Sequence, residues 1–191
     1  MHILNVYYNI SFRYVAEALF QVLYYMKQIM PKKIFVHCIG HSLGAHICGF
    51  TGKLIRKKLR KEKEGGHMQT FDSVLDRISG LDPAGPMFFN DNPEYKYPDK
   101  IEPGGRLAHT DAQVVDIIHT DGIVRSPFQY GTLERAGTVD FYIGANGSYG
   151  GLQPGCNCNF CNLCGCSHHK AHMYYIASML VSELQINRIL K

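Results

Sequence analysis

The sequence predicts an α/β fold, in which a mostly parallel sheet is covered by helices on both faces. Short apolar runs bounded by glycine or proline alternate along the chain with longer segments that have helical apolar spacing. Strands separated by helices form parallel sheets, because each helix returns the chain to the edge where the next strand starts. The 191 residues, 46% of them hydrophobic, are enough to bury one core, so residues 1–191 are interpreted as one domain.

The expected elements follow one another with neither an internal repeat nor a linker. In chain order, they are a helix over 12–30, a strand over 33–39, a helix over 43–59, strands over 78–81, 114–118 and 140–143, and a helix over 171–190. The first helix is expected to end before Pro31, which cannot continue it. Its predicted core-facing residues are Val15, Leu19, Val22, Leu23, Met26 and Ile29.

The positive charge of the chain is confined to one segment. Residues 53–64 hold seven Lys or Arg and two Glu, a local charge of +5, so a net charge of +4 leaves −1 for the rest. Such a run is typical of a solvated helix end and argues against a broad basic surface for nucleic acid. The most apolar stretch, 12–30, is interrupted by charged residues such as Arg13 and Glu17, so no membrane span is predicted.

The cysteines indicate an oxidising compartment. Seven are present, and five of them lie in the short segment from Cys156 to Cys166, a density more typical of secreted proteins than of cytosolic ones. Glycosylation sequons at Asn9 and Asn146 agree with secretion. Residues 1–8 lack the basic start and long apolar run of a secretory signal, which taken alone favours the cytosol.

The turn after the first expected strand reads Gly-His-Ser-Leu-Gly over 40–44, the pattern of a nucleophile elbow. A sharp strand-to-helix turn holds the serine, Ser42, in a strained conformation, and the glycines on either side let helix and strand approach. The N–H of Leu43 would lie at the helix N-terminus, where it can stabilise an oxyanion. The alternative is a glycine-rich turn in which Ser42 only caps the helix.

A serine nucleophile needs a base to take its proton and an acid to orient that base. In folds with this elbow the order along the chain is serine, acid, histidine. Asp82 fits the acid, because it ends an expected strand and Pro83 follows it, although an ordinary Asp-Pro turn would look the same. The residues alone do not identify the base, for which there are five downstream candidates: His109, His119, His168, His169 and His172.

Four blocks, 35–46, 80–86, 111–121 and 153–156, together resemble the pancreatic lipase family of the α/β-hydrolase superfamily. The phospholipase A1 branch, including the membrane-associated phosphatidic-acid-selective type, is the most similar in appearance. The resemblance implies a partial α/β-hydrolase fold and a catalytic triad of Ser42, Asp82 and His168. His168 is chosen because it matches the histidine of the family's Cys-x-His-x-Arg/Lys block, which makes His169 and His172 bystanders.

The resemblance also implies a lid closed by a disulfide between Cys156 and Cys166. Only nine residues lie between these cysteines, and a short lid leaves a site open to amphiphilic substrates, which favours phospholipids over triacylglycerols. The other cysteines of the segment have no family role: Cys158, Cys161 and Cys164. The alternative for the whole cluster, followed by His168, is a zinc or other soft-metal site.

The chain departs from the family pattern in three places. The strands that precede the first helix, one of which supplies a second oxyanion donor, are expected to be absent, as is the C-terminal β-sandwich. A fragment or an incomplete gene is one explanation. The family's calcium loop is half matched, with Asp111 present but Ala108 at the second acidic position, so neither calcium nor another cofactor is expected. Residues 53–67 look like an insertion.

The expected function is hydrolysis of lipid carboxylic esters through an acyl-enzyme. The substrate would be a phospholipid or acylglycerol at a lipid–water interface, with peripheral membrane contact only and no nucleic acid. Family resemblance places such a protein outside the cell. Two alternatives stay open: a catalytically inactive, lipase-like lipid-binding or yolk-type protein, and a cysteine-rich metal-binding protein.

Overall fold

A computed structural model describes residues 2–30, 34–66, 75–86, 88, 105–122, 130–144, 152–156 and 165–189, with side chains described between 11 and 181. Its centre is a parallel four-stranded sheet in the order β1-β2-β3-β4. The strands are β1 (His37–His41), β2 (Leu75–Leu81), β3 (Ala112–His119) and β4 (Val139–Tyr142). The α/β prediction is therefore confirmed, although β1 begins four residues later than expected from the apolar run at 33–39.

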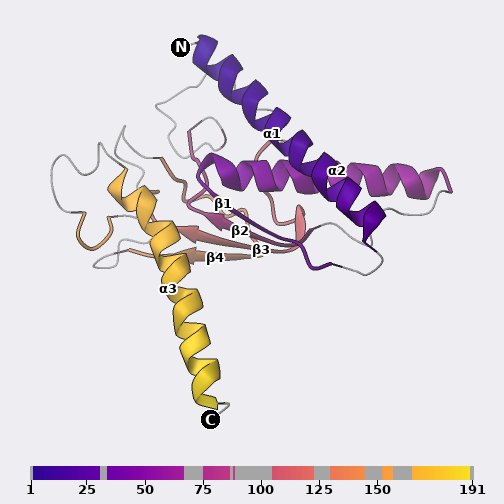
Figure 1. The fold of residues 1–191 in the computed structure, drawn as a ribbon. Coiled ribbons are helices and arrows are strands. Elements are labelled where there is room, and N and C mark those ends of the chain that lie inside the picture. Colours follow the sequence, from indigo (N-terminus) through magenta and orange to yellow (C-terminus); the bar gives the residue numbers. More distant parts are fainter. Residues whose placement is uncertain are drawn as a thin grey trace.

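Among the residues that the structure describes, three helices accompany the sheet: α1 (His2–Ile29), α2 (Leu43–Glu64) and α3 (Cys166–Ile189). The main core joins α1 and α2 to one sheet face, where Ile78, Val115 and Ile117 are buried. Side chains alternate between the two faces along a strand, and the second cluster uses Leu81 and Ile118 together with α3. Figure 1 shows α1 crossing α2, while α3 begins beside the arrowheads of the strands. The predicted helices on both faces are thus present.

The buried side of α1 differs from the predicted one. Val15, Val22 and Ile29 are each more than half exposed, whereas Phe12 and Ala16 are fully buried. Leu19 and Leu23 belong to both the predicted stripe and the observed one. The predicted core-facing side of α1 is therefore wrong by part of a turn. The observed side is the one that carries the aromatic contacts of Phe12. The ring of Phe12 lies against those of Phe50 and Phe88, with centroids 5.8 and 5.5 Å away.

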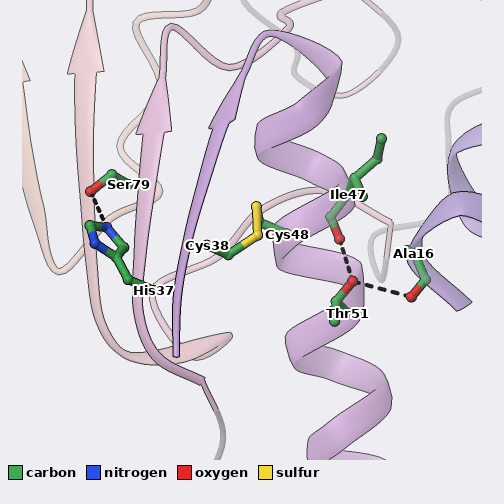
Figure 2. The surroundings of a disulfide bond; sticks show 7 residues. All are labelled: Ala16, His37, Cys38, Ile47, Cys48, Thr51 and Ser79. Atoms are coloured by element: carbon green, nitrogen blue, oxygen red, sulfur yellow. Dashed lines mark hydrogen bonds between the residues drawn. A yellow bond between two sulfur atoms is a disulfide. The ribbon is translucent and has the colours of Figure 1, made fainter. Parts of the chain in front are cut away.

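A disulfide that the sequence did not predict attaches α2 to the sheet. Cys38 of β1 is bonded to Cys48 of α2, as Figure 2 shows. In the next turn of α2, the hydroxyl of Thr51 lies 2.9 Å from the carbonyl oxygen of Ile47 and 3.2 Å from that of Ala16 in α1 (Figure 2). Covalent and polar links therefore hold β1, α2 and α1 together on one side of the sheet.

None of the described helices is both long enough and apolar enough to cross a bilayer.

Candidate active site

Ser42 and Asp82 leave neighbouring strands at the same level. The last residue of β1, His41, pairs with the last residue of β2, Leu81. The N–H of Ser42 donates to the carbonyl oxygen of Leu81 over 3.0 Å, and the N–H of Asp82 donates to that of Ile118 over 2.7 Å. Parallel strands end at one edge of the sheet, which is where α/β proteins place their functional groups. The strand register alone thus brings the two residues together.

Both residues have a left-handed backbone. In the described part of the chain, Ser42 (φ 56°) and Asp82 (φ 43°) are the non-glycine residues with positive φ. This region is costly for a residue with a Cβ, and such strain is found preferentially at functional sites. For Ser42 it is the strain that a sharp strand-to-helix turn imposes. For Asp82 no feature of the sequence indicates this conformation, because a following proline favours an extended backbone at the residue before it.

Ser42 stands at the N-cap of α2, but its side chain makes no capping hydrogen bond. The alternative in which this serine serves only to cap the helix is therefore not supported. Leu43 is the first residue of α2, and N–H groups in the first turn of a helix have no partner within the helix. Its amide lies at the positive end of the helix dipole, where an anion is favoured.

Asp82 is fully buried and its carboxylate is held by three donors. Oδ1 accepts the N–H groups of Thr120 and Asp121 over 2.9 and 3.2 Å. Oδ2 lies 2.6 Å from Nδ1 of His168, which is also buried. A carboxylate at Nδ1 fixes the imidazole tautomer and leaves Nε2 able to accept a proton. An ordinary Asp-Pro turn, the alternative interpretation, does not by itself account for a buried carboxylate with these three partners.

Of the five histidines that the residues left open, His168 is the one that the structure places on Asp82. His119 is also buried, but its Nδ1 lies 2.7 Å from the carbonyl oxygen of Thr132 and its Nε2 lies 2.9 Å from the Asp140 carboxylate. Both of its nitrogens are therefore engaged within the fold. His109 and His169 are exposed, and His172 is partly exposed.

A second carboxylate, that of Asp121, and a glycine, Gly131, lie beside the pair formed by Asp82 and His168. The sequence indicated neither of them. Burial raises the pKa of Asp121 to about 6, an effect that the nearby charge of Asp82 reinforces. At Gly131, a Cβ atom would lie 2.5 Å from both carboxylate oxygens of Asp82. Gly131 thus lets the backbone pack directly on the acid. A sequence signal for this contact does not exist, because the glycine lies far along the chain from Asp82.

A different Ser, His and Asp meet on the sheet itself. Nε2 of His37 lies 2.8 Å from the hydroxyl of Ser79, and this hydroxyl donates to Asp116 over 2.8 Å. Asp116 also pairs with Arg77 over 2.6 Å. Ser79 is fully buried in the middle of β2 and its proton is directed at a carboxylate. We interpret this group as a structural network, in contrast to Ser42, which is partly exposed at the end of β1.

The segment before α3 is anchored by a buried glutamine. Nε2 of Gln153 donates to the carbonyl oxygens of Thr120 and Ile143, over 2.9 and 2.6 Å. The hydroxyl of Tyr174 in α3 donates to its Oε1 over 3.1 Å, and its own N–H donates to Ser167 Oγ over 3.2 Å. One side chain therefore connects the ends of β3 and β4 to the helix that carries His168. Nothing in the local sequence around Gln153 predicts this role.

Cys156 and Cys166 form a disulfide, the pairing that the family resemblance implies. Cys166 is the first residue of α3, so this bond ties the start of the helix to the Gln153 segment. A metal cluster that uses all five cysteines is contradicted, because disulfide sulfurs are not thiolate ligands. The predicted lid interior, with Cys158, Cys161 and Cys164, lies outside the described residues.

His46 supports the segment that follows Asp82. It is fully buried in α2, with Nε2 2.9 Å from the carbonyl oxygen of Ala84, while Nδ1 accepts the N–H of Leu107 over 3.0 Å. Its ring stacks on Phe88 at 3.7 Å. Burial lowers the pKa of His46 to about 3, so the ring is neutral across the physiological range.

The remnant of the family's calcium loop does not fit a calcium ion. The Asp111 carboxylate pairs with the ammonium of Lys53 and with the guanidinium of Arg56, the latter over 2.8 Å. It also accepts the N–H of Ala108 over 2.8 Å, and Lys53 donates to the carbonyl oxygen of Arg106 over 2.7 Å. Calcium needs six or more oxygen ligands, and here the buried carboxylate is already neutralised by two side-chain cations.

This ion pair also corrects one sequence expectation. The run 53–64 was predicted to be a solvated helix end, and five of its twelve residues are exposed: Lys57, Arg60, Lys61, Lys63 and Glu64. Lys53, however, is mostly buried against Asp111, with a side chain that is 19% exposed. A cation at the start of a lysine run cannot be distinguished from its exposed neighbours by composition, because the partner lies in a distant loop.

Comparison with known proteins places the chain in a family. The family model described as Lipase matches residues 7–187. This chain belongs to the lipase family. The lipase-family chain is 42% identical to a phospholipase A1 from Polybia paulista over 141 residues, which are 73% of this chain and 33% of that protein.

Two vertebrate proteins are also similar to this lipase-family chain. Pancreatic lipase-related protein 2 from Cavia porcellus is 36% identical over 149 residues, 78% of this chain and 26% of that protein. Lipase member H from Xenopus tropicalis is 37% identical over 154 residues, 77% of this chain and 25% of that protein. The chain therefore spans about a third or less of the length of these relatives.

Proposed function

We propose that this lipase-family chain hydrolyses carboxylic esters of lipids with Ser42 as nucleophile, His168 as general base and Asp82 as the orienting acid. The observation that carries the proposal is the 2.6 Å contact between the buried Asp82 carboxylate and Nδ1 of His168. The ring of His41, which precedes Ser42 in the chain, lies 4.5 Å from the His168 ring. The base is therefore at the end of the strand from which the serine extends.

In the proposed reaction, the hydroxyl oxygen of Ser42 attacks the ester carbonyl carbon while Nε2 of His168 takes the hydroxyl proton. The proton then passes to the leaving alcohol as the carbon–oxygen bond breaks, which leaves an acyl-enzyme on Ser42. Water, deprotonated by the same nitrogen, releases the fatty acid and restores the serine. Asp82 holds the imidazole in position and stabilises its charged form throughout. The N–H of Leu43, at the start of α2, would donate to the developing oxyanion.

The substrate class that we favour is a phospholipid cleaved at one acyl ester. The relatives include proteins named phospholipase A1, and the disulfide before His168 joins residues only 10 positions apart. A lid of this length covers little of a site, which suits amphiphilic molecules presented at a lipid–water interface. The contact with membrane would be peripheral. Two disulfides support a location outside the cell, because such bonds persist in oxidising compartments.

The first test uses a fluorophosphonate probe, which reacts covalently with activated serines, together with release of fatty acid from phosphatidylcholine and phosphatidic acid vesicles. Ser42→Ala should abolish labelling and lower hydrolysis by up to about 10⁶-fold. Asp82→Asn should lower hydrolysis by about 10⁴-fold, because the imidazole loses its orienting acid. Ser178→Ala is the matched control, since Ser178 is exposed on α3 away from the reacting groups.

Each outcome of this test decides between two candidate functions. Labelling that is lost in Ser42→Ala and kept in Ser178→Ala supports the hydrolase. A folded parent chain that takes up no probe would instead favour the non-catalytic, lipid-binding alternative. Triolein emulsions, assayed beside the phospholipids, separate the two ester substrates, and faster release from triolein would contradict the phospholipid preference.

A further inference from the structure

Three histidines form a second group beside Asp82 and His168. His41 ends β1, while His169 and His172 lie one turn apart on α3. One ring nitrogen from each residue lies within 4.8 Å of those from the other two. The family resemblance makes His169 and His172 bystanders, and the proposed reaction does not use their side chains.

We propose that His41, His169 and His172 bind a zinc ion, and that the bound ion inhibits the neighbouring hydrolase site. Imidazole nitrogen is a preferred ligand of zinc and of similar transition-metal ions. Residues three apart on a helix share one face, so the two α3 histidines can approach one ion together. The third ligand comes from a strand end, which makes the site a link between two elements.

The ring geometry fits a site that closes around an ion. The ring centroids of His41 lie 5.6 Å from His169 and 5.7 Å from His172, and the last two are 6.0 Å apart. In a tetrahedral zinc site with bonds of about 2.0–2.1 Å, ligand nitrogens are about 3.4 Å apart. The 4.8 Å limit on the nitrogens therefore leaves an excess of at most about 1.4 Å over this spacing, which rotation of the exposed His169 ring can close.

The hydrogen bonds around His41, His169 and His172 leave a nitrogen of each ring available to bind a metal ion. Within the described residues, the side chains of His169 and His172 make no hydrogen bond, so both keep nitrogen lone pairs open to solvent. His41 differs, because its Nε2 lies 3.0 Å from the carbonyl oxygen of His168. A metal-bound histidine commonly donates its other ring N–H to a backbone carbonyl. When Nε2 of His41 donates in this way, Nδ1 carries the lone pair that a metal requires.

Inhibition follows from the position of the group and rests on the proposed function. His41 precedes Ser42, and His169 follows His168. An ion held by both would clamp the serine turn to the start of α3. It would also occupy space beside the His168 ring, and the approach of an ester from that side would be blocked.

Binding is tested first, without any assay of activity. The untagged 191-residue chain, with free thiols alkylated by iodoacetamide, is titrated with zinc chloride by calorimetry. We expect one ion per chain. His169→Ala and His172→Ala should each weaken binding by at least the roughly 10- to 100-fold that loss of a supporting residue costs a metal site. His109→Ala is the control, because His109 is exposed in the segment before β3 and far from the group in sequence.

A spectroscopic measurement identifies the ligand atoms. Cobalt(II) in place of zinc should give visible d–d bands without a thiolate charge-transfer band in the near ultraviolet, as nitrogen ligands require. Circular dichroism confirms that each variant is folded. The site would be refuted by zinc affinity that persists unchanged in the His169→Ala/His172→Ala double variant, or by a thiolate band in the chain without alkylation, which would assign the ion to cysteines.

The final measurement addresses inhibition and separates the two proposals. Zinc should suppress probe labelling of Ser42 in the parent chain and in His109→Ala, but not in the double variant. Stoichiometric zinc in a folded chain that takes up no probe would overturn the proposed function and leave the metal site standing. Labelling of Ser42 in a chain that binds no zinc would support the proposed function and refute the metal site. Zinc that binds and leaves labelling unchanged would refute the inhibitory role.

Discussion

At the scale of single residues, two carboxylates near His168 differ in the number of hydrogen-bond donors around them. Asp82 receives two backbone N–H groups and the imidazole, so its charge is well supported. Asp121 accepts one backbone N–H, from Tyr130 over 3.1 Å, and burial raises its pKa from 3.8 to about 6. Folding therefore shifts Asp121 toward its neutral form, chiefly because burial removes water from the charge, and the nearby charge of Asp82 adds to this effect.

The Asp121 environment predicts a specific dependence of stability on pH. A raised pKa means that the folded chain binds the proton more tightly, so this contribution to stability is full below about pH 3.8 and is lost as the pH rises through about 6. Asp121→Asn, which cannot ionise, should therefore raise the free energy of unfolding at pH 7 by about 1–2 kcal/mol, after allowance for partial exposure. Urea unfolding at pH 4 and pH 7 measures the effect.

The control for this prediction is Glu64→Gln, at a carboxylate whose side chain is 69% exposed. Its stability difference from the parent should be small at both pH values. An Asp121→Asn variant that differs from the parent equally at pH 4 and pH 7 would contradict the assigned pKa shift.

At the scale of elements, the turn from β1 to α2 determines where Ser42 lies. A Cβ atom on Gly40 would lie 2.3 Å from the backbone of Gly44, whereas one on Gly44 would meet nothing within 4 Å. The expectation that both glycines permit the close approach is therefore half right. Gly40 is sterically required, because the first turn of the helix packs directly on the end of the strand.

The two glycines give a matched pair of substitutions. Gly40→Ala should lower the free energy of unfolding by about 1–3 kcal/mol or more, because the rigid backbone of α2 has to move. Gly44→Ala should be tolerated or stabilising by up to about 1 kcal/mol, since alanine favours a helix over glycine. Chemical unfolding of both variants, with probe labelling of Ser42 as a second readout, makes the comparison. Equal losses in the two variants would show that the backbone contact does not set this turn.

At the scale of the whole molecule, two disulfides of equal span have different structural roles. Cys38–Cys48 joins β1 to α2 inside the main core, and Cys156–Cys166 joins the start of α3 to the Gln153 segment. Both close loops with a sequence separation of 10. Chain entropy therefore assigns each a similar contribution to stability, about 3 kcal/mol. Their effect on the proposed chemistry should differ, because only the second one positions the helix that carries His168.

Double substitutions of each pair separate these roles. The Cys38→Ser/Cys48→Ser and Cys156→Ser/Cys166→Ser variants should lose comparable free energy of unfolding by urea denaturation. Under conditions where both remain folded, the second variant should show the larger fall in probe labelling of Ser42, since α3 is freed at its first residue. A greater loss of labelling in the Cys38→Ser/Cys48→Ser variant would mean that α3 is held by its other contacts.

Features that depend on local chemistry can be predicted from the sequence alone. The strand–turn–helix at Ser42, the aspartate at the end of β2 and the four strands of the parallel sheet are each set by residues close together in the chain. Apolar runs, glycines and prolines act within a few residues of where they stand, so they can be recognised without coordinates. His168 is chosen through family resemblance, because the five histidines downstream of Asp82 cannot be distinguished by local pattern.

The features that join distant segments follow only from the packing of the folded chain. These include the buried stripe of α1, the pairing of Lys53 with Asp111, the Cys38–Cys48 bond and the contact of Gly131 with Asp82. The same holds for the group formed by His41, His169 and His172. Helical periodicity allows several neighbouring stripes to be buried, and a charge or a histidine accepts many partners. Which partner is present depends on packing across the whole chain, so the physical information lies in the assembled fold.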